Sequence, residues 1–169
     1  RLDRPVSGVI VFARNSKAAA RLAEQFRNRT VRKEYLCVTE GIPTPATMRL
    51  TDWLIKDAER AHVTVADAHA TGAKSAELTY EVLGTAAGRA LVRIELHTGR
   101  MHQIRVQLSH RGWPIVGDHQ YGASGSFPGI DTGAGPHPVV IALHAARLEL
   151  DHPIRYDRIT LSAPMPSNW

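Results

Sequence analysis

The segment TGRMHQIRVQLSHRG, residues 98–112, places basic and imidazole side chains among residues that are suited to burial. Arg105 is the clearest case, because it lies between Ile104 and Val106. A buried guanidinium is costly unless a carboxylate pairs with it. The leading candidate is Asp3 in the N-terminal RLDRPVSG, where flanking arginines favour an ionised carboxylate. The alternative is that Asp3 only caps a turn.

Motifs for several other chemistries are missing from the sequence. There is no HExxH and no Cys/His pair at ligand spacing, which argues against a metal site. The glycine-rich patterns GxxxxGK[ST] and GxGxxG and the GxSxG elbow of many hydrolases are also lacking. We therefore expect chemistry that uses carboxylate, phenol and guanidinium groups and needs no cofactor.

Composition bounds the class of protein. The 169 residues fit one domain, and 21 Lys and Arg against 16 Asp and Glu give a formal charge of +5. Seventeen of these cations are arginines, which suit phosphate groups and base stacking, so a nucleic-acid partner is permitted. A GC-rich coding bias would also explain the arginines. No apolar run could span a bilayer, and no signal peptide is recognisable. The single cysteine, Cys37, is expected to be a small buried hydrophobe in a reduced, cytoplasmic setting.

Hydrophobic periodicity indicates more strands than helices. A helix is expected at about 17–28 with Ser16 as its N-cap, and residues 122–138 are expected to form a mobile Gly- and Pro-rich loop. Residues 103–108 alternate as in a strand but also place apolar residues on one helical face, so periodicity does not decide between the two. The predicted strands are 7–13, EYLCVTEG ending at Gly41, HVTVA, 76–83, 89–96, part of VVIALHAARLEL, and RITLSAP. The predicted fold class is α+β, a single domain (residues 1–169) with a mixed, mostly antiparallel sheet flanked by helices and loops.

Four blocks of the sequence together resemble one known family. They are RLDRPVSGVIVFAR, KEYLCVTEG, TGRMHQIRVQLSHRGWPIVGDHQYG and LHAARLEL, in this order, and the match extends to about Pro164. The blocks closely resemble the RluA-like family of RNA pseudouridine synthases. The resemblance implies a catalytic aspartate at Asp3, an active-site tyrosine at Tyr35 and an arginine at Arg105 that pairs with the aspartate. It also implies that the block containing Arg105 is a helix.

The resemblance implies isomerisation of specific uridines in structured rRNA or tRNA. In this reaction uracil leaves C1′ of the ribose, turns and rejoins through C5, so no cofactor is consumed. Asp3 would act as a nucleophile or as a base on a sugar proton, and the two roles stay open. Tyr35 would stack on uracil and take the C5 proton, and Arg105 would keep Asp3 ionised and oriented. Arg1 is a candidate to fill the stack that a flipped nucleotide leaves.

Further basic residues are candidate RNA contacts, although a solvated basic rim is an equally simple reading for some of them. The set of candidate RNA-binding residues is Arg1, Arg4, Lys33, Arg100, His102 and Arg111. His102 and His144 are more simply explained as structural histidines. The alternative functions are a non-catalytic RNA-binding module that retains the fold and, with less support, a carboxylate-dependent glycosidase.

Two departures from the family pattern concern the start of the chain and position 101. The family usually has a His before RLD, with strands upstream, so the natural chain is expected to extend further. Met101 stands where the family commonly has Thr or Ser. A monomer with no obligate protein partner and no membrane association is expected.

Overall fold

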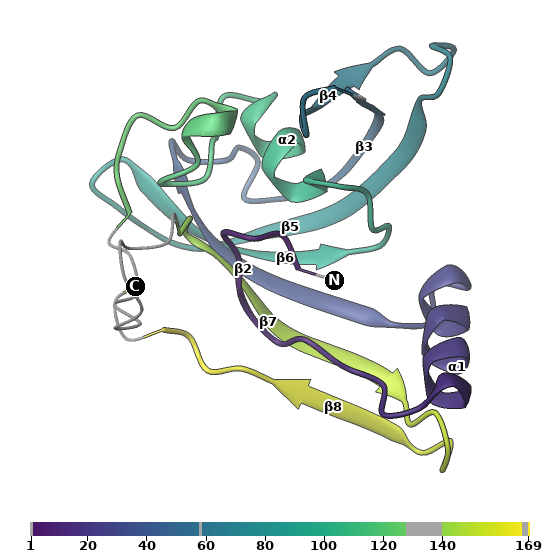
Figure 1. Cartoon of the computed structure of the whole chain (residues 1–169). Coiled ribbons are helices and arrows are strands. Elements are labelled where there is room, and N and C mark those ends of the chain that lie inside the picture. Colours follow the sequence, from purple (N-terminus) through teal and green to yellow (C-terminus); the bar gives the residue numbers. More distant parts are fainter. Residues whose placement is uncertain (1, 58, 128–139, 167–168) are drawn as a thin grey trace.

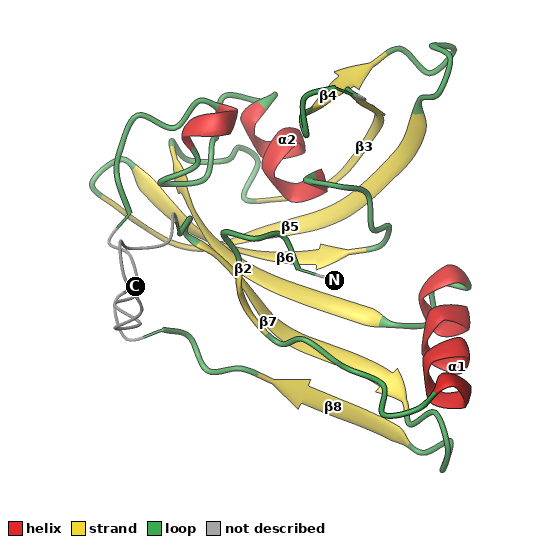
Figure 2. Cartoon of the chain, viewed as in Figure 1, coloured by secondary structure: helices red, strands yellow, loops and turns green. Residues whose placement is uncertain are grey.

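The strands pair into one mixed sheet that crosses the whole molecule (Figures 1 and 2). This computed structural model describes residues 2–57, 59–127, 140–166 and 169. In chain order the described elements are β1 (Ser7–Gly8), α1 (Ser16–Arg27), β2 (Arg32–Glu40), β3 (Thr47–Lys56), β4 (Val63–Ala66), β5 (Lys74–Ala86), β6 (Arg89–Leu96), α2 (Gln103–Ser109), the short 3₁₀ helix η1 (His119–Tyr121), β7 (Leu143–Asp151) and β8 (Arg158–Ser162). No helix among them is both long and apolar enough to cross a membrane.

The order of the sheet is β1-β7-β2-β6-β5-β3-β4, and β8 also pairs with β7. Among the strand pairs of the described residues, β1 and β7 run parallel and the other pairs are antiparallel. The predicted α+β class with a mixed, mostly antiparallel sheet is therefore confirmed. The predicted hairpin is also present as β5 and β6. Strand β6 has the expected bounds, whereas β5 is longer than expected because it begins at Lys74 and runs up to the tight turn at Ala87 and Gly88.

The first predicted strand is much shorter in the structure. Residues 7–13 were expected to be extended and paired, but only Ser7 and Gly8 form a ladder with β7. The reason is that β1 and β8 share one edge of β7, and β8 occupies that edge from Arg147 to Asp151. A longer β1 would therefore have no free partner on β7.

Two other elements differ from the sequence prediction. Helix α1 begins at Ser16 with Asn15 as its N-cap, because the side chain of Asn15, not that of Ser16, accepts a hydrogen bond from the backbone N–H of Ala18. Strand β3 was not predicted. Its inward-facing side includes Leu50 and Leu54, but Asp52 lies between them and breaks the apolar alternation.

Residues 103–109 form helix α2, as the resemblance implied. All six residues from Gln103 to Leu108 are buried, so the alternation that suggested a strand does not separate an exposed face from a buried one. Ile104 and Leu108 pack into the main core against the sheet, whereas Val106 joins a second cluster with Leu54. Helix α2 therefore lies across one face of the sheet, as Figure 1 shows. Cys37 is fully buried in the main core, as predicted.

Candidate functional site

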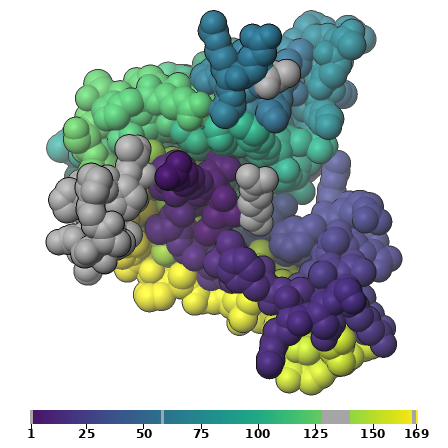
Figure 3. All heavy atoms as spheres, viewed as in Figure 1, coloured from purple at the N-terminus to yellow at the C-terminus, as the bar shows by residue number. Residues whose placement is uncertain are grey.

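Asp3 lies in a turn that leads into β1. The backbone N–H of Val6 donates to the carbonyl of Asp3 at 3.1 Å, and Pro5 accepts from the N–H of Ile141 at 3.1 Å. The turn is therefore anchored next to the parallel ladder of β1 and β7. Figure 3 shows this N-terminal segment in the middle of one face, between the part of the molecule that contains α2 and the part that contains α1 and β8.

Gly8 makes the close approach of β1 to β7 possible. Its φ is +116°, and a Cβ at this position would lie 2.3 Å from the carbonyl oxygen of Ala145. Side chains other than glycine rarely adopt this backbone conformation, and here one would also overlap the neighbouring strand. The glycine of the RLDRPVSG segment thus helps to hold Asp3 over the sheet.

Arg105 extends from α2 and is only 4% exposed. Its principal partner is Asp118, which accepts hydrogen bonds from Nε and Nη2, each at 2.7 Å, and is itself buried. Asp3 also forms an ion pair with Arg105, but the Nη1 to Oδ2 distance is 3.9 Å, which is too long for a hydrogen bond. The pairing of Asp3 with Arg105 is therefore present, whereas the expectation that Asp3 alone makes burial of Arg105 tolerable needs correction.

Residues next to Asp118 complete the surroundings of Arg105. Gln120 accepts a hydrogen bond from Nη2 at 2.9 Å, and the guanidinium carbon lies 4.8 Å from the centre of the Tyr121 ring. The Tyr121 hydroxyl accepts from the backbone N–H of Val63 at 3.0 Å and lies 2.8 Å from Nδ1 of His102. Its own proton is therefore available to Nδ1, which places the imidazole proton of a neutral His102 on Nε2.

His102 lies at the start of α2 in a left-handed conformation, with φ of 51°. Burial, followed by the nearby charge of Arg105, lowers the pKa of this imidazole. Neutral His102 has a hydrogen-bond donor at Nε2, and its ring lines the same cavity as Asp3 and Arg105. The residue is thus bonded like a structural histidine and also lies at the site.

Tyr35 lies on β2, on the opposite side of the cavity from α2. Burial, with a contribution from the charge of Asp3, raises the pKa of Tyr35 to about 12. The phenol is therefore protonated at neutral pH in the free protein. Two residues earlier on the same strand, Lys33 donates to the carbonyl of Thr98 at 3.3 Å, and burial and then the charge of Arg29 lower the pKa of Lys33.

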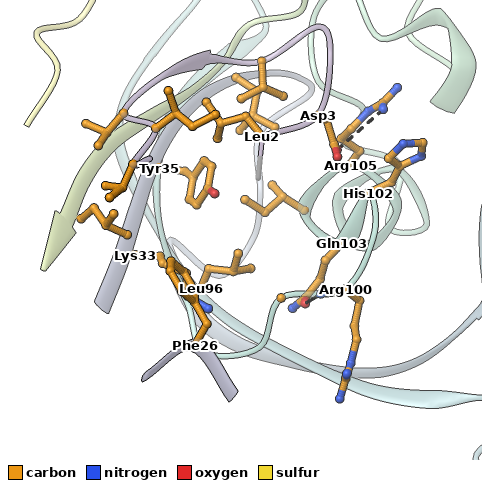
Figure 4. Close-up of a pocket in the computed structure, with 18 of the residues that line it drawn as sticks. Leu2, Asp3, Phe26, Lys33, Tyr35, Leu96, Arg100, His102, Gln103 and Arg105 are labelled. Carbon is orange, nitrogen blue, oxygen red and sulfur yellow. Dashed lines mark hydrogen bonds and ion pairs between the residues drawn. The ribbon is translucent and has the colours of Figure 1, made fainter. Parts of the chain in front are cut away.

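These groups line one cavity of about 450 Å³ (Figure 4). Asp3 and Arg105 lie at one side, and the ring of Tyr35 faces the cavity from the other. Apolar side chains, including Leu2, Leu96 and Ile104, form much of the wall. A flat aromatic ring, a carboxylate and a largely apolar wall suit the binding of a planar base attached to a sugar.

A second, larger groove of about 1180 Å³ continues from this cavity and shares Asp3, His102 and Arg105 with it. Arg100 lines both spaces, whereas Arg4 and Lys56 line the groove and Lys33 lines the smaller cavity. Glu59 and Asp118 also line the groove, but its cationic side chains outnumber the carboxylates. The groove therefore offers positive charge with direct access to Asp3, as a phosphate backbone would require.

Not every predicted RNA contact lies at this site. Arg111 lines neither space, because it bonds to both carboxylate oxygens of Asp52 at 2.9 and 3.0 Å. Arg1 lies outside the described residues. His144 is buried and bonded to Ser7 and to the carbonyl of Ala163, as expected of a structural histidine. Among the described residues, no three His, Cys, Asp or Glu side chains gather as metal ligands would.

Sequence reasoning missed three partners of Arg105, namely Asp118, Gln120 and Tyr121. The number of hydrogen-bond donors on arginine could have pointed to them. A guanidinium carries five N–H donors, so a single carboxylate in a distant loop could not satisfy a buried arginine. Asp118 is the only acidic residue between Arg105 and residue 130 in the sequence, and it follows α2 closely.

Comparisons with known proteins point to one family. A family model described as RNA pseudouridylate synthase matches residues 1–110. The chain is 36% identical over 180 residues to tRNA pseudouridine synthase C of Pasteurella multocida, covering 100% of this chain and 72% of the relative. It is 32% identical over 173 residues to ribosomal large subunit pseudouridine synthase D of Pseudomonas aeruginosa, of which it spans only 53% while the match covers 100% of this chain.

The structure is also similar to a solved structure, human RNA Pseudouridylate Synthase Domain Containing 4. The TM-score is 0.77 at 26% identity, and the match covers 99% of this chain and 70% of the human chain. The shared fold and the carboxylate site beside a basic groove place the protein among enzymes that modify RNA. Within this class, the chain belongs to the RluA-like family of RNA pseudouridine synthases, as the sequence motifs had indicated.

Proposed function

We propose that this enzyme isomerises specific uridines of structured tRNA or rRNA, with Asp3 as the reacting carboxylate. The observation that supports this most is that Asp3, Tyr35 and Arg105 line one cavity although they come from three distant parts of the sequence. The names of the relatives include enzymes of both tRNA and ribosomal RNA, so both substrates belong in the proposal.

Breaking the bond between N1 of uracil and C1′ of ribose develops positive charge on the sugar. Asp3, with a side chain 31% exposed at the cavity, is placed for either of two roles. As a nucleophile, it bonds to C1′ while the C1′–N1 bond breaks, and it leaves when C1′ bonds to C5. As a base, it removes a sugar proton and later returns it. Either route needs a carboxylate beside the ribose.

The last step moves the C5 proton away and leaves N1 of the turned ring protonated. Tyr35 enters this step as a phenol, because its pKa is raised to about 12. Its oxygen can accept the C5 proton only while its own proton passes to another acceptor. The ring also offers a stacking surface for uracil within the cavity.

A target uridine within a helix has to leave the base stack, at a cost of a few kcal/mol. The groove lined by Arg4 and Arg100 can hold the flanking phosphates while the nucleotide occupies the cavity. Arg1 stays our candidate for the side chain that fills the gap left in the base stack by the flipped nucleotide. If Arg1→Ala retains full activity on structured RNA, this role of Arg1 is wrong.

The test compares wild type with Asp3→Asn on unmodified total tRNA and, separately, total rRNA. Pseudouridine is scored by reverse-transcription stops that depend on carbodiimide treatment. We expect new stops with wild type in one RNA fraction and none with Asp3→Asn, whereas both proteins bind the RNA. Stops that appear equally with both proteins would contradict the role of Asp3. Binding without stops for either protein would favour the RNA-binding module.

A further inference from the structure

Arg105 has five N–H donors, and their partners divide between two regions of the chain. The Nε donor and one Nη2 donor go to the two oxygens of Asp118, each at 2.7 Å. The other Nη2 donor goes to Gln120 at 2.9 Å. Only Nη1 lacks a hydrogen-bond acceptor among the described residues, and its nearest carboxylate oxygen, in Asp3, is 3.9 Å away.

The fork of Asp118 fixes the plane of the guanidinium, because two parallel hydrogen bonds leave little freedom to rotate. The ring of Tyr121 covers one face of the same group, with its centre 4.8 Å from the guanidinium carbon. Asp118, Gln120 and Tyr121 belong to one segment around η1, which packs against α2. This segment therefore directs Nη1 towards Asp3 and the cavity.

Asp3 cannot direct Arg105 in the same way. At 3.9 Å the two groups attract each other by charge, but no hydrogen bond sets the angle between them. The side chain of Asp3 is 31% exposed, whereas that of Asp118 is 1% exposed. A buried carboxylate with two short hydrogen bonds constrains its partner more strongly than a partly exposed carboxylate without one.

We propose that Asp118 is a positioning residue of the reaction: it holds Arg105 so that Nη1 faces Asp3 and the sugar throughout the catalytic cycle. The inference rests on the proposed role of Asp3 and deepens it. If Asp3 bonds to C1′, it loses its negative charge, and Arg105 would lose its counter-ion if Asp3 were the only one. With Asp118 in place, Arg105 stays paired and keeps its position while Asp3 reacts.

The first test is a kinetic comparison of Asp118→Asn with Asp52→Asn on a substrate RNA. Asp52 is a matched control, because it forms the same two-oxygen contact with another arginine of the α2 region, Arg111, but lines neither cavity. We expect kcat to fall about 100-fold in Asp118→Asn, since misplacement by about 1 Å has this effect, with KM within about threefold. Asp52→Asn should keep kcat within about twofold of wild type, although its melting temperature falls.

A second measurement keeps the inference testable if Asp118→Asn folds poorly. Nitrogen-15 NMR of the Arg105 Nε–Hε group reports the hydrogen bond to Asp118 directly. In Asp3→Asn this resonance should keep its position, because Asp118 and not Asp3 holds the guanidinium. Gln120→Ala removes an acceptor at an exposed residue, so it should fold normally and lower kcat about threefold to tenfold.

Two outcomes would overturn the inference. One is a kcat for Asp118→Asn that matches that of Asp52→Asn, and the other is an Arg105 resonance that moves in Asp3→Asn. Failure of the proposed function looks different, since Asp3→Asn would then form pseudouridine. The combination of an inactive Asp3→Asn and a fully active Asp118→Asn would reject the positioning role alone.

Discussion

Tyr35 illustrates how burial decides the chemical state of a single residue. Its phenol has a pKa raised to about 12, so ionisation at neutral pH contributes nothing to its action in the free enzyme. Tyr35→Phe retains the ring and removes the oxygen. We expect RNA binding within about threefold of wild type and a loss of 100-fold to 10,000-fold in the single-turnover rate, the range for a missing general acid or base.

The control for Tyr35→Phe is Tyr156→Phe, a change at an exposed tyrosine far along the chain that lines neither cavity. It should leave the rate unchanged. Full activity in Tyr35→Phe would restrict Tyr35 to stacking and would remove its proposed part in proton transfer.

His102 provides a test by pH. Its pKa is lowered in the folded protein by burial and by Arg105, whereas a histidine in an unfolded chain has a pKa of about 6.5. The unfolded chain therefore binds the proton more readily, and the stabilisation from neutral His102 is present above pH 6.5 and is lost as the pH falls through the folded pKa. The difference in unfolding free energy between wild type and His102→Asn should shrink from pH 7.5 to pH 5, as measured by urea denaturation. A difference that grows on acidification would contradict this assignment.

At the scale of residues, the family resemblance predicted roles for Asp3, Tyr35 and Arg105, and the structure brings all three to one cavity. The contacts of Arg105 could not be predicted in the same way. Its hydrogen bonds to Asp118 and Gln120 depend on how the chain returns after α2, and no spacing rule connects these positions. Arg111 was predicted to contact RNA for its charge alone, but β3 places Asp52 beside it.

At the scale of elements, β1 and its glycine connect the sheet to the site. Gly8→Ala would force a methyl group to within 2.3 Å of the Ala145 carbonyl in a left-handed backbone conformation. We expect a loss of about 3 kcal/mol or more in unfolding free energy, together with a loss of activity beyond the fraction that is unfolded. Chemical denaturation and rates measured well below the melting temperature separate the two effects.

Gly72→Ala is the matched control for Gly8→Ala. Gly72 has φ of +84°, and nothing lies within 4 Å of the Cβ it would gain. The backbone strain is therefore similar without the overlap, and a smaller loss of about 1 kcal/mol with unchanged kcat is expected. Equal effects of the two changes would mean that the contact of β1 with β7 does not hold Asp3.

The errors in predicting the elements have identifiable causes. Residues 7–13 have the composition of a strand, but a strand also needs a neighbouring strand with an unpaired edge. On β7, most of the edge next to residues 7–13 is paired with β8. Strand β3 was missed because Asp52 occupies an inward-facing position, where hydrogen bonds from Arg111 and Gln107 make a charge tolerable. Both causes involve pairing between segments that are distant in the sequence. The periodicity of a short segment contains no information about such pairing.

At the scale of the whole molecule, the basic groove predicts a salt-dependent interaction with RNA. The logarithm of the RNA association constant falls as the logarithm of the salt concentration rises. Each phosphate contact that is lost should make this slope shallower by about 0.7 to 0.9. Arg4→Gln and Arg100→Gln, which alter residues of the groove, should each make the slope shallower by about this amount. Arg93→Gln removes an exposed arginine that is paired with Glu81 and lines neither cavity, so it serves as the control. Equal slopes for all three variants would place the RNA elsewhere.

The fold class could be predicted from the strands and turns in the sequence, but the order of the strands in the sheet could not. The central pairing joins β2 to β7, about a hundred residues later, and such a contact leaves no mark in local composition. The predicted mobile loop at 122–138 falls largely in residues 128–139, which lie outside the described part of the chain. Its described beginning is bonded to Glu40, through the N–H groups of Ser124 and Gly125.

The short ladder of β1 has a consequence for thermal behaviour. Asp3 is attached to the sheet through two paired residues and a few loop hydrogen bonds, whereas the other neighbouring strands are joined by ladders of four to eight residue pairs. A segment with so few cross-links opens at a lower free energy than the protein as a whole. On gradual warming, this enzyme should therefore lose turnover several degrees before its circular dichroism spectrum changes.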